Sequence, residues 1–225
     1  MKLSRRLQAV YNMVPKGIAA DVGSDHGKLI ISLYENKVIT KGYAIENKIG
    51  PYRRLVKAIT ERGVLDNVIP LLSDGITDLP SSVNTVIIAG MGGNNIIKIL
   101  KAHPSKLKNV KTIIIDAHNA IPEVRKEISN MGYVIADENI VSEDGIYYEI
   151  IKFIKGDIAF LNEPDLEFGP KLRSEKSLLF IEKYQARLHE IDLLLEKGLP
   201  ENRVIELNKE KERIKSVLWK PRNYF

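Results

Sequence analysis

The chain has 225 residues, of which 44% are hydrophobic and 28% charged, and it contains no cysteine. This composition is typical of a globular protein that buries its own core, and it excludes a disulfide scaffold, a thiolate metal site and a cysteine nucleophile. We expect no bound metal. The first residues contain no signal-peptide pattern and no later run would span a bilayer, so we expect a cytoplasmic protein without membrane contact.

The formal net charge of +5 is unevenly distributed. Residues 1–62 carry 12 basic and 5 acidic side chains, whereas residues 157–225 carry 13 of each. A clustered basic excess is typical of a surface that neutralises phosphates, although a solvated basic face without a partner explains it equally well.

Between residues 17 and 154, short apolar runs alternate with segments of helical period, which predicts an α/β fold with helices on both faces of a sheet. A polar turn at residues 142–145 separates the last two strands, so we expect a hairpin that ends the sheet with an antiparallel strand. The predicted strands are residues 17–22, 41–45, 68–72, 85–89, 112–115, 133–141 and 147–154. The predicted helices are residues 28–35, 51–62, 94–101 and 122–130.

The pattern changes after Gly156, where strand-like runs stop and a loop with Pro164, Gly169 and Pro170 follows. We therefore predict two domains, residues 1–156 and residues 157–225.

The second domain has apolar residues at helical spacing over residues 181–195 and again over residues 204–218, on either side of a Gly-Leu-Pro connection. This predicts an antiparallel helical hairpin with a coiled-coil-like seam, interrupted by Lys211. Packing within the chain explains the seam better than a dimerising coiled coil, so we expect a monomer.

The first predicted strand ends in an acid and a glycine-bearing loop, Asp21-Val22-Gly23-Ser24-Asp25-His26-Gly27. A dinucleotide fingerprint that starts at Gly23 needs glycines at positions 25 and 28, where this chain has Asp25 and Lys28. A carboxylate facing a pyrophosphate would be costly, whereas a cofactor with a positive centre would accept it. S-adenosylmethionine is such a cofactor.

Further acids and glycines follow the next strands. Asp21 is placed to meet the cofactor ammonium, Glu46 the ribose hydroxyls and Asp74 the adenine amino group. Each feature alone is as well explained by a turn or an exposed acid, but their ordered occurrence at strand ends favours a cofactor site. The candidate cofactor residues are Asp21, Gly23, Ser24, Asp25, His26, Glu46, Asn47, Asp74, Gly75, Ala89, Gly90 and Met91.

Several motifs together resemble the bacterial tRNA adenine-N1 methyltransferases that act on nucleotide 22, a family of class I methyltransferases. The motifs are Arg6-Leu7, Val14-Pro15-Lys16-Gly17, Ala20-Asp21-Val22-Gly23-Ser24-Asp25-His26, Ile88-Ala89-Gly90-Met91-Gly92-Gly93 and Phe168-Gly169-Pro170. The resemblance covers nearly the whole chain. It implies a Rossmann-like sheet, S-adenosylmethionine as cofactor, a C-terminal helical pair, and methyl transfer to N1 of an adenine in the D-arm of tRNA.

This chain departs from the family at two places. Gly27-Lys28 stands where the family has Ala-Tyr, and Asp116-Ala117-His118 stands where it has Gln-Pro-Asn. These departures bear on the base pocket more than on the cofactor site.

N1 of neutral adenine already carries a lone pair, so the reaction needs positioning and tolerance of positive charge rather than a general base. The candidate catalytic residues are Asp25, which would offset that charge, and Met91, which would line the methyl group or the base. A helix cap at Asp25 and a buried filler at Met91 are equally good explanations. The Ala-Gly-Met-Gly stretch lacks the Asn-Pro-Pro pattern expected of N6 methylation.

Basic and aromatic side chains near the front of the chain are the candidate contacts for tRNA. They are Arg5, Arg6, Tyr11, Lys16, Lys28, Arg53 and Arg54. Two alternatives stay open: a non-catalytic RNA-binding protein on a degenerate methyltransferase fold and, more weakly, a nicotinamide oxidoreductase.

Overall fold

The computed structural model describes residues 2–157 and 160–219. It contains two compact units, Met1–Ala159 and Phe160–Phe225, and each is described by itself.

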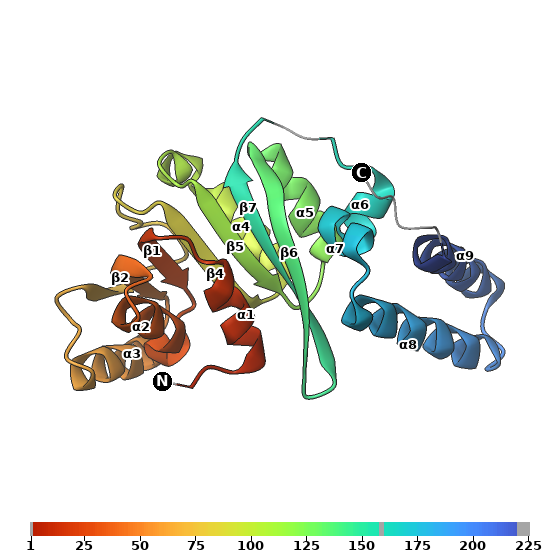
Figure 1. Cartoon of the computed structure of the whole chain (residues 1–225), viewed down its shortest axis with the longest axis horizontal. Coiled ribbons are helices and arrows are strands. Elements are labelled where there is room, and N and C mark those ends of the chain that lie inside the picture. Colours follow the sequence, from red (N-terminus) through yellow and green to blue (C-terminus); the bar gives the residue numbers. More distant parts are fainter. Residues whose placement is uncertain (1, 158–159, 220–225) are drawn as a thin grey trace. The chain divides into compact units, whose positions relative to one another are not determined.

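The first unit is built on a seven-stranded sheet with the strand order β3-β2-β1-β4-β5-β7-β6 (Figure 1). The first five strands in the chain pair in parallel, and β7 pairs antiparallel to both β5 and β6. The predicted final hairpin is confirmed. The strands are β1 (Gly17–Val22), β2 (Ile39–Glu46), β3 (Val68–Leu72), β4 (Thr85–Met91), β5 (Thr112–Ala117), β6 (Tyr133–Glu143) and β7 (Ile146–Lys155).

Two separate apolar clusters cover the two faces of this sheet. One face packs against α1, α2 and α3, and the other against α4 and α5, as the alternation of buried residues along each strand requires. The predicted α/β class is confirmed. The helices are α1 (Arg5–Met13), α2 (Lys28–Glu35), α3 (Ile49–Glu61), α4 (Gly93–Ala102) and α5 (Ile121–Asn130), with short 3₁₀ segments η1 (Asp25–Gly27) and η2 (Pro104–Leu107).

Helix α1 is an element that the sequence pattern did not reveal. Ser4 caps it, because its hydroxyl accepts a hydrogen bond from the Leu7 amide at 3.3 Å. The helix buries Ala9, Val10 and Met13 against the sheet. A helix of nine residues has too few turns to show a clear hydrophobic period in the sequence. An isolated helix of this length is unstable, so its stability comes from packing against the sheet.

A buried ion-pair network ties α5 to the terminal hairpin. The guanidinium of Arg125 donates to Glu138 on β6 at 2.8 Å and to Glu149 on β7 at 2.6 Å, and the three side chains are almost completely buried. Such a group of charges is tolerated in a core only when every member is paired.

The second unit is entirely helical. It comprises α6 (Glu163–Phe168), α7 (Pro170–Glu175), α8 (Leu178–Leu195) and α9 (Glu201–Trp219). The predicted loop after Gly156 is therefore wrong from Glu163 onward. Asn162 and Asp165 form a capping box that starts α6, and the proline at the next helix's first position suits a helix start.

The predicted hairpin of α8 and α9 is present. Its seam buries Tyr184, Ile191, Leu207 and Ile214. Lys211, the polar interruption, is satisfied by an ion pair with Asp192 on the facing helix. Of the helices in the described residues, none has the length and hydropathy needed to cross a membrane.

Candidate active site

A cavity of about 300 Å³ opens at the carboxyl ends of β1 to β4. This is the edge at which open α/β sheets bind ligands, because helix starts and loops diverge there. Six of the predicted cofactor residues line it: Gly23, Glu46, Asn47, Asp74, Gly75 and Met91. Residues up to 68 positions apart in the sequence thus line one cavity, because the strand order places their strands side by side.

Gly23 and Met91 meet across this cavity. Gly23 has a φ of +77°, and a Cβ atom added there would lie 2.3 Å from Cε of Met91. The glycine is therefore needed for its backbone conformation, and the terminal methyl of Met91 occupies the space beside it. Its amide and that of Ser24 donate to the carbonyl of Ile45, at 2.9 and 3.2 Å, which joins the loop to the end of β2.

Two acids follow β2 and β3 in the cavity wall. Glu46 is buried at the end of β2, and burial raises the pKa of its carboxyl, with Asp25 adding to the rise. Asp74 is exposed and accepts a long hydrogen bond, 3.4 Å, from the Asn47 amide. The wall therefore offers carboxylate oxygens on two neighbouring strand ends, and these can accept hydrogen bonds from ribose hydroxyls and an amino group.

Asp21 lies under the loop and not on the cavity wall. Its side chain is buried and accepts a 2.5 Å hydrogen bond from the Ser24 hydroxyl. Burial raises the pKa of Asp21 to about 6, the Ser24 hydrogen bond opposes that rise and the nearby Glu46 adds to it. In this structure the carboxylate holds the glycine loop, and its predicted contact with a cofactor ammonium stays a prediction.

Asp25 and His26 project from the loop into solvent. The His26 Nε2 atom lies 3.4 Å from Oδ1 of Asp25, and both side chains are exposed. Asp25 makes no helix-capping hydrogen bond, since Gly27 occupies the cap position of α2. The alternative role of Asp25 as a helix cap is therefore wrong, while its catalytic role stays a prediction.

Ala89 and Gly90 at the end of β4 do not line the cavity. Ala89 packs against the apolar cluster on the α1 face of the sheet, and Gly90 lies beside Arg6. The Arg6 guanidinium donates to Asp116 on β5 at 2.5 Å and lies 5.4 Å from the ring centroid of Tyr148 on β7. His118, in the segment that departs from the family pattern, meets the Tyr148 ring edge-on at 5.9 Å.

Sequence reasoning missed six residues of the cavity wall: Val22, Ile45, Lys48, Ser73, Asn95 and Ile99. Asn95 lies in the first turn of α4, and its side-chain amide donates to the Met91 sulfur at 3.5 Å. The signal for Asn95 is its place in the first helical turn after a glycine-rich strand end, because such helix starts border the ligand site of open α/β sheets. Lys48 had no comparable signal, since a lysine after a strand is usually a solvated one.

The predicted RNA contacts differ in their placement. Arg5, Lys28, Arg53 and Arg54 are exposed and stand at or near the starts of α1, α2 and α3, which lie at the cavity edge of the sheet. Lys16 precedes β1 and therefore lies at the opposite edge.

Arg6 and Tyr11 are half-buried. Arg6 is held in its ion pair, and Tyr11 packs against the apolar cluster below α1. Neither residue is presented as freely as the exposed basic residues.

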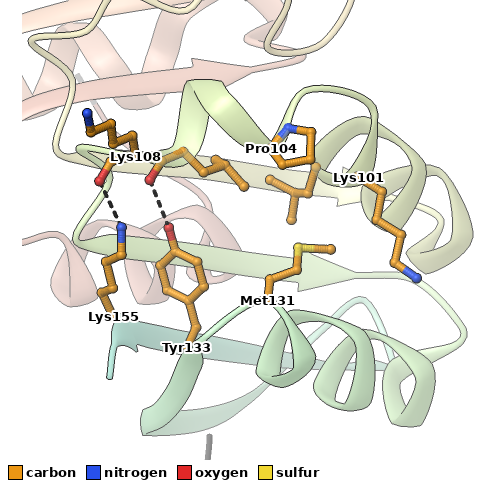
Figure 2. A pocket seen from close by; sticks show the side chains of 8 residues that line it. Lys101, Pro104, Lys108, Met131, Tyr133 and Lys155 are labelled. Carbon is orange, nitrogen blue, oxygen red and sulfur yellow. Dashed lines mark hydrogen bonds between the residues drawn. The ribbon is translucent and has the colours of Figure 1, made fainter. Parts of the chain in front are cut away.

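A second cavity of about 220 Å³ lies at the amino ends of the parallel strands (Figure 2). Several of its polar groups are engaged: the Lys155 ammonium donates to the Lys108 carbonyl at 2.8 Å, and the Tyr133 hydroxyl to the Val110 carbonyl at 3.0 Å. Lys101 pairs with Glu127. None of the predicted site residues lines this cavity. Within the described part of the chain, no cluster of three or more potential metal ligands occurs.

The comparisons with known proteins agree with this geometry. A family model described as "Methyltransferase domain" matches residues 3–151. The tRNA (adenine(22)-N(1))-methyltransferase of Bacillus subtilis is 29% identical over 203 residues, which are 87% of this chain and 85% of that protein.

Two solved structures share the fold of both units. The crystal structure of the B. subtilis m1A22 tRNA methyltransferase TrmK matches with a TM-score of 0.87 and 28% identity, covering 96% of this chain and 99% of that one. A Streptococcus pneumoniae relative in complex with S-adenosyl-L-methionine matches with a TM-score of 0.88 and 33% identity, covering 96% and 100%. With the strand order, the cavity and the family match on the same residues, this chain belongs to the methyltransferase-domain family.

Proposed function

We propose that this protein transfers a methyl group from S-adenosylmethionine to N1 of adenine 22 in tRNA. The observation that carries the proposal is the cavity at the carboxyl ends of β1 to β4, in a chain whose fold matches m1A22 methyltransferases over almost its full length. The first 156 residues would bind the cofactor, and the helical unit would contribute shape to tRNA recognition. A tRNA substrate agrees with the cytoplasmic location expected from the sequence.

The hydrogen-bond acceptors of the cavity fit S-adenosylmethionine, whose sulfonium supplies the methyl group. Glu46 and Asp74 would accept hydrogen bonds from ribose and adenine, and the glycine loop at Gly23 leaves the backbone open to close approach. The exposed Asp25 would face the acceptor and offset the positive charge that develops on the adenine. None of these groups has to remove a proton, because N1 reacts through its own lone pair.

The direct test is incubation of the protein with labelled S-adenosylmethionine and unmodified tRNA, followed by mass mapping of nucleosides and fragments. We expect 1-methyladenosine at position 22. Glu46→Gln should lower cofactor affinity by about tenfold or more, because it removes a charged hydrogen-bond acceptor. Glu61→Gln, an exposed acid on α3, is the matched control and should bind the cofactor normally.

Each negative outcome identifies a different error. Cofactor binding without methylation of any tRNA would reject the proposed reaction. RNA binding without cofactor binding would instead identify a non-catalytic protein on this fold. N6-methyladenosine in place of 1-methyladenosine would show that the protein methylates the exocyclic amino group and not N1.

A further inference from the structure

The end of β4 contains a β-bulge beside the cofactor cavity. Strands β4 and β5 pair regularly up to Ala89 opposite Asp116, and the register then shifts so that Met91 stands opposite Ala117. Gly90 is the extra residue, with a φ of +84°. A bulge of this kind redirects the side chain that follows it, which here is Met91 in the cavity wall.

Arg6 occupies the space beside this bulge. A Cβ atom added to Gly90 would lie 3.1 Å from Nη1 of Arg6, the same atom that donates to Asp116 at 2.5 Å. The Tyr148 ring lies beside the guanidinium, 5.4 Å from its central carbon. Arg6 of α1 therefore lies against the Gly90 bulge of β4, with Asp116 of β5 and Tyr148 of β7 around its guanidinium.

The Arg6–Asp116 ion pair is more deeply buried than stability of the sheet alone would require. The Asp116 side chain is 0% exposed and that of Arg6 is 21% exposed. Among the described residues, Oδ1 of Asp116 has no hydrogen-bond partner, although it is buried. Burial raises the pKa of Asp116, and the hydrogen bond and charge of Arg6 oppose that rise. Because a buried carboxylate is costly, an apolar residue would serve stability alone at least as well.

The other side of the same loop is held by the residues that follow β5. The His118 amide donates to the Met91 carbonyl at 2.9 Å, and the Gly93 amide donates to Oδ1 of Asn119 at 3.0 Å. Backbone contacts therefore fix the loop after the bulge. At the bulge itself, a hydrogen bond from the Gly90 backbone and the charge of Arg6 both favour the ionised Asp116 carboxylate.

We propose that Arg6 and Asp116 are positioning residues for methyl transfer, whose ion pair holds the Gly90 bulge and thereby aims Met91 into the cofactor cavity. Only the expected effect on the rate of methyl transfer rests on the proposed function. In this inference Arg6 positions the reacting centre and does not contact a tRNA phosphate.

The test compares Arg6→Gln with Arg62→Gln, a matched control that breaks the partly exposed Arg62–Glu35 pair at the C-cap of α3. In Arg6→Gln we expect kcat to fall by about tenfold to a hundredfold, as for other small misplacements of reacting groups, with the tRNA KM within about threefold of wild type. The affinity for S-adenosylhomocysteine, measured by calorimetry, should change by less than about threefold, since the acids at β2 and β3 are untouched.

A second readout does not depend on activity. In protein labelled with ¹³C-methyl methionine, the Met91 resonance should shift or broaden in Arg6→Gln, and its response to S-adenosylhomocysteine should change. The Met131 resonance, from the cavity at the amino ends of the strands, serves as the internal reference. Asp116→Asn keeps the side-chain shape and should move Met91 in the same direction, which covers the case in which Arg6→Gln does not fold. Arg6→Lys should restore part of kcat.

Three results would overturn the inference. An unchanged Met91 resonance in both variants would show that the pair does not set the bulge. A higher tRNA KM with unchanged kcat and a shallower salt dependence would make Arg6 a phosphate contact. A parallel loss of unfolding temperature, cofactor affinity and kcat would make the pair merely structural. If the wild type does not methylate tRNA, the proposed function fails, and the Met91 resonance still decides the inference.

Discussion

At the residue scale, the electrostatics of the site centre on Asp21. Its carboxyl is buried beneath the glycine loop and its pKa is raised to about 6, above the ordinary value of 3.8. The folded apo protein therefore holds this proton more tightly than the unfolded chain. Stability contributed by the protonated form is present at low pH and is lost as the pH rises through about 6. A cofactor ammonium nearby would reverse this preference, because it favours the ionised carboxylate.

We therefore expect cofactor affinity to rise with pH. Calorimetry with S-adenosylhomocysteine should show binding about tenfold weaker at pH 5 than at pH 7, since most of Asp21 is protonated at the lower pH. Asp21→Asn should bind weakly at both values, leaving only the smaller dependence that the raised pKa of Glu46 contributes. A variant with the full wild-type pH profile would show that another group is responsible.

Sequence reasoning at this scale identified residue types and positions better than contacts. Glu46, Asp74 and Gly23 were predicted from their places after strands, and the structure brings them into one cavity. The burial of Asp21 under Ser24 was not predictable, because it depends on how the loop closes over the strand end.

At the scale of elements, the Arg125 network decides whether the final hairpin stays attached to α5. Glu138 and Glu149 lie on the two strands of that hairpin and both pair with the one guanidinium. The periodicity of β6 and β7 predicted the hairpin. It did not predict that a charge would anchor it, because a lysine or arginine on a helix is usually solvated.

Replacing Arg125 by methionine should lower the free energy of unfolding by about 3–5 kcal/mol, because two buried carboxylates lose their partner. Urea denaturation measures the loss. Arg62→Gln should cost less than about 1 kcal/mol, since its ion pair with Glu35 is partly exposed. Adding Glu138→Gln and Glu149→Gln to Arg125→Met should recover part of the lost stability. A small effect of Arg125→Met alone would mean that water compensates these charges.

The prediction for the second unit was mixed in the same way. The long period of α8 and α9 was readable from the sequence, whereas α6 and α7, with six residues each, were too short to show a period. Their starts depend on the capping box at Asn162 and on Pro170, local signals that also suit a loop.

At the scale of the whole molecule, the basic excess of the first 62 residues is the main electrostatic feature. The structure divides the predicted contacts by edge: Arg5, Lys28, Arg53 and Arg54 share the cavity edge of the sheet, and Lys16 does not. A tRNA that presents a base to the cavity would meet the first set.

We therefore expect tRNA binding to weaken steeply with salt, and each neutralised phosphate contact to lower the slope of log K against log salt by about one. Arg53→Gln and Arg54→Gln should each show this change in fluorescence titrations at several salt concentrations. Lys126→Gln, an exposed lysine on α5, is the control with the same loss of charge. Equal slopes in all variants would place the tRNA on another surface.

The sequence by itself determined the α/β class, the terminal hairpin and the acids and glycines at strand ends, because these depend on periodicity and chain order, which are local properties. Only the tertiary structure decided that Arg6 meets Asp116, 110 residues away, beside the Gly90 bulge. Such a contact depends on strand register, on a bulge and on the packing of α1. None of these features produces a periodic pattern in the sequence, so they can be seen only in the folded structure.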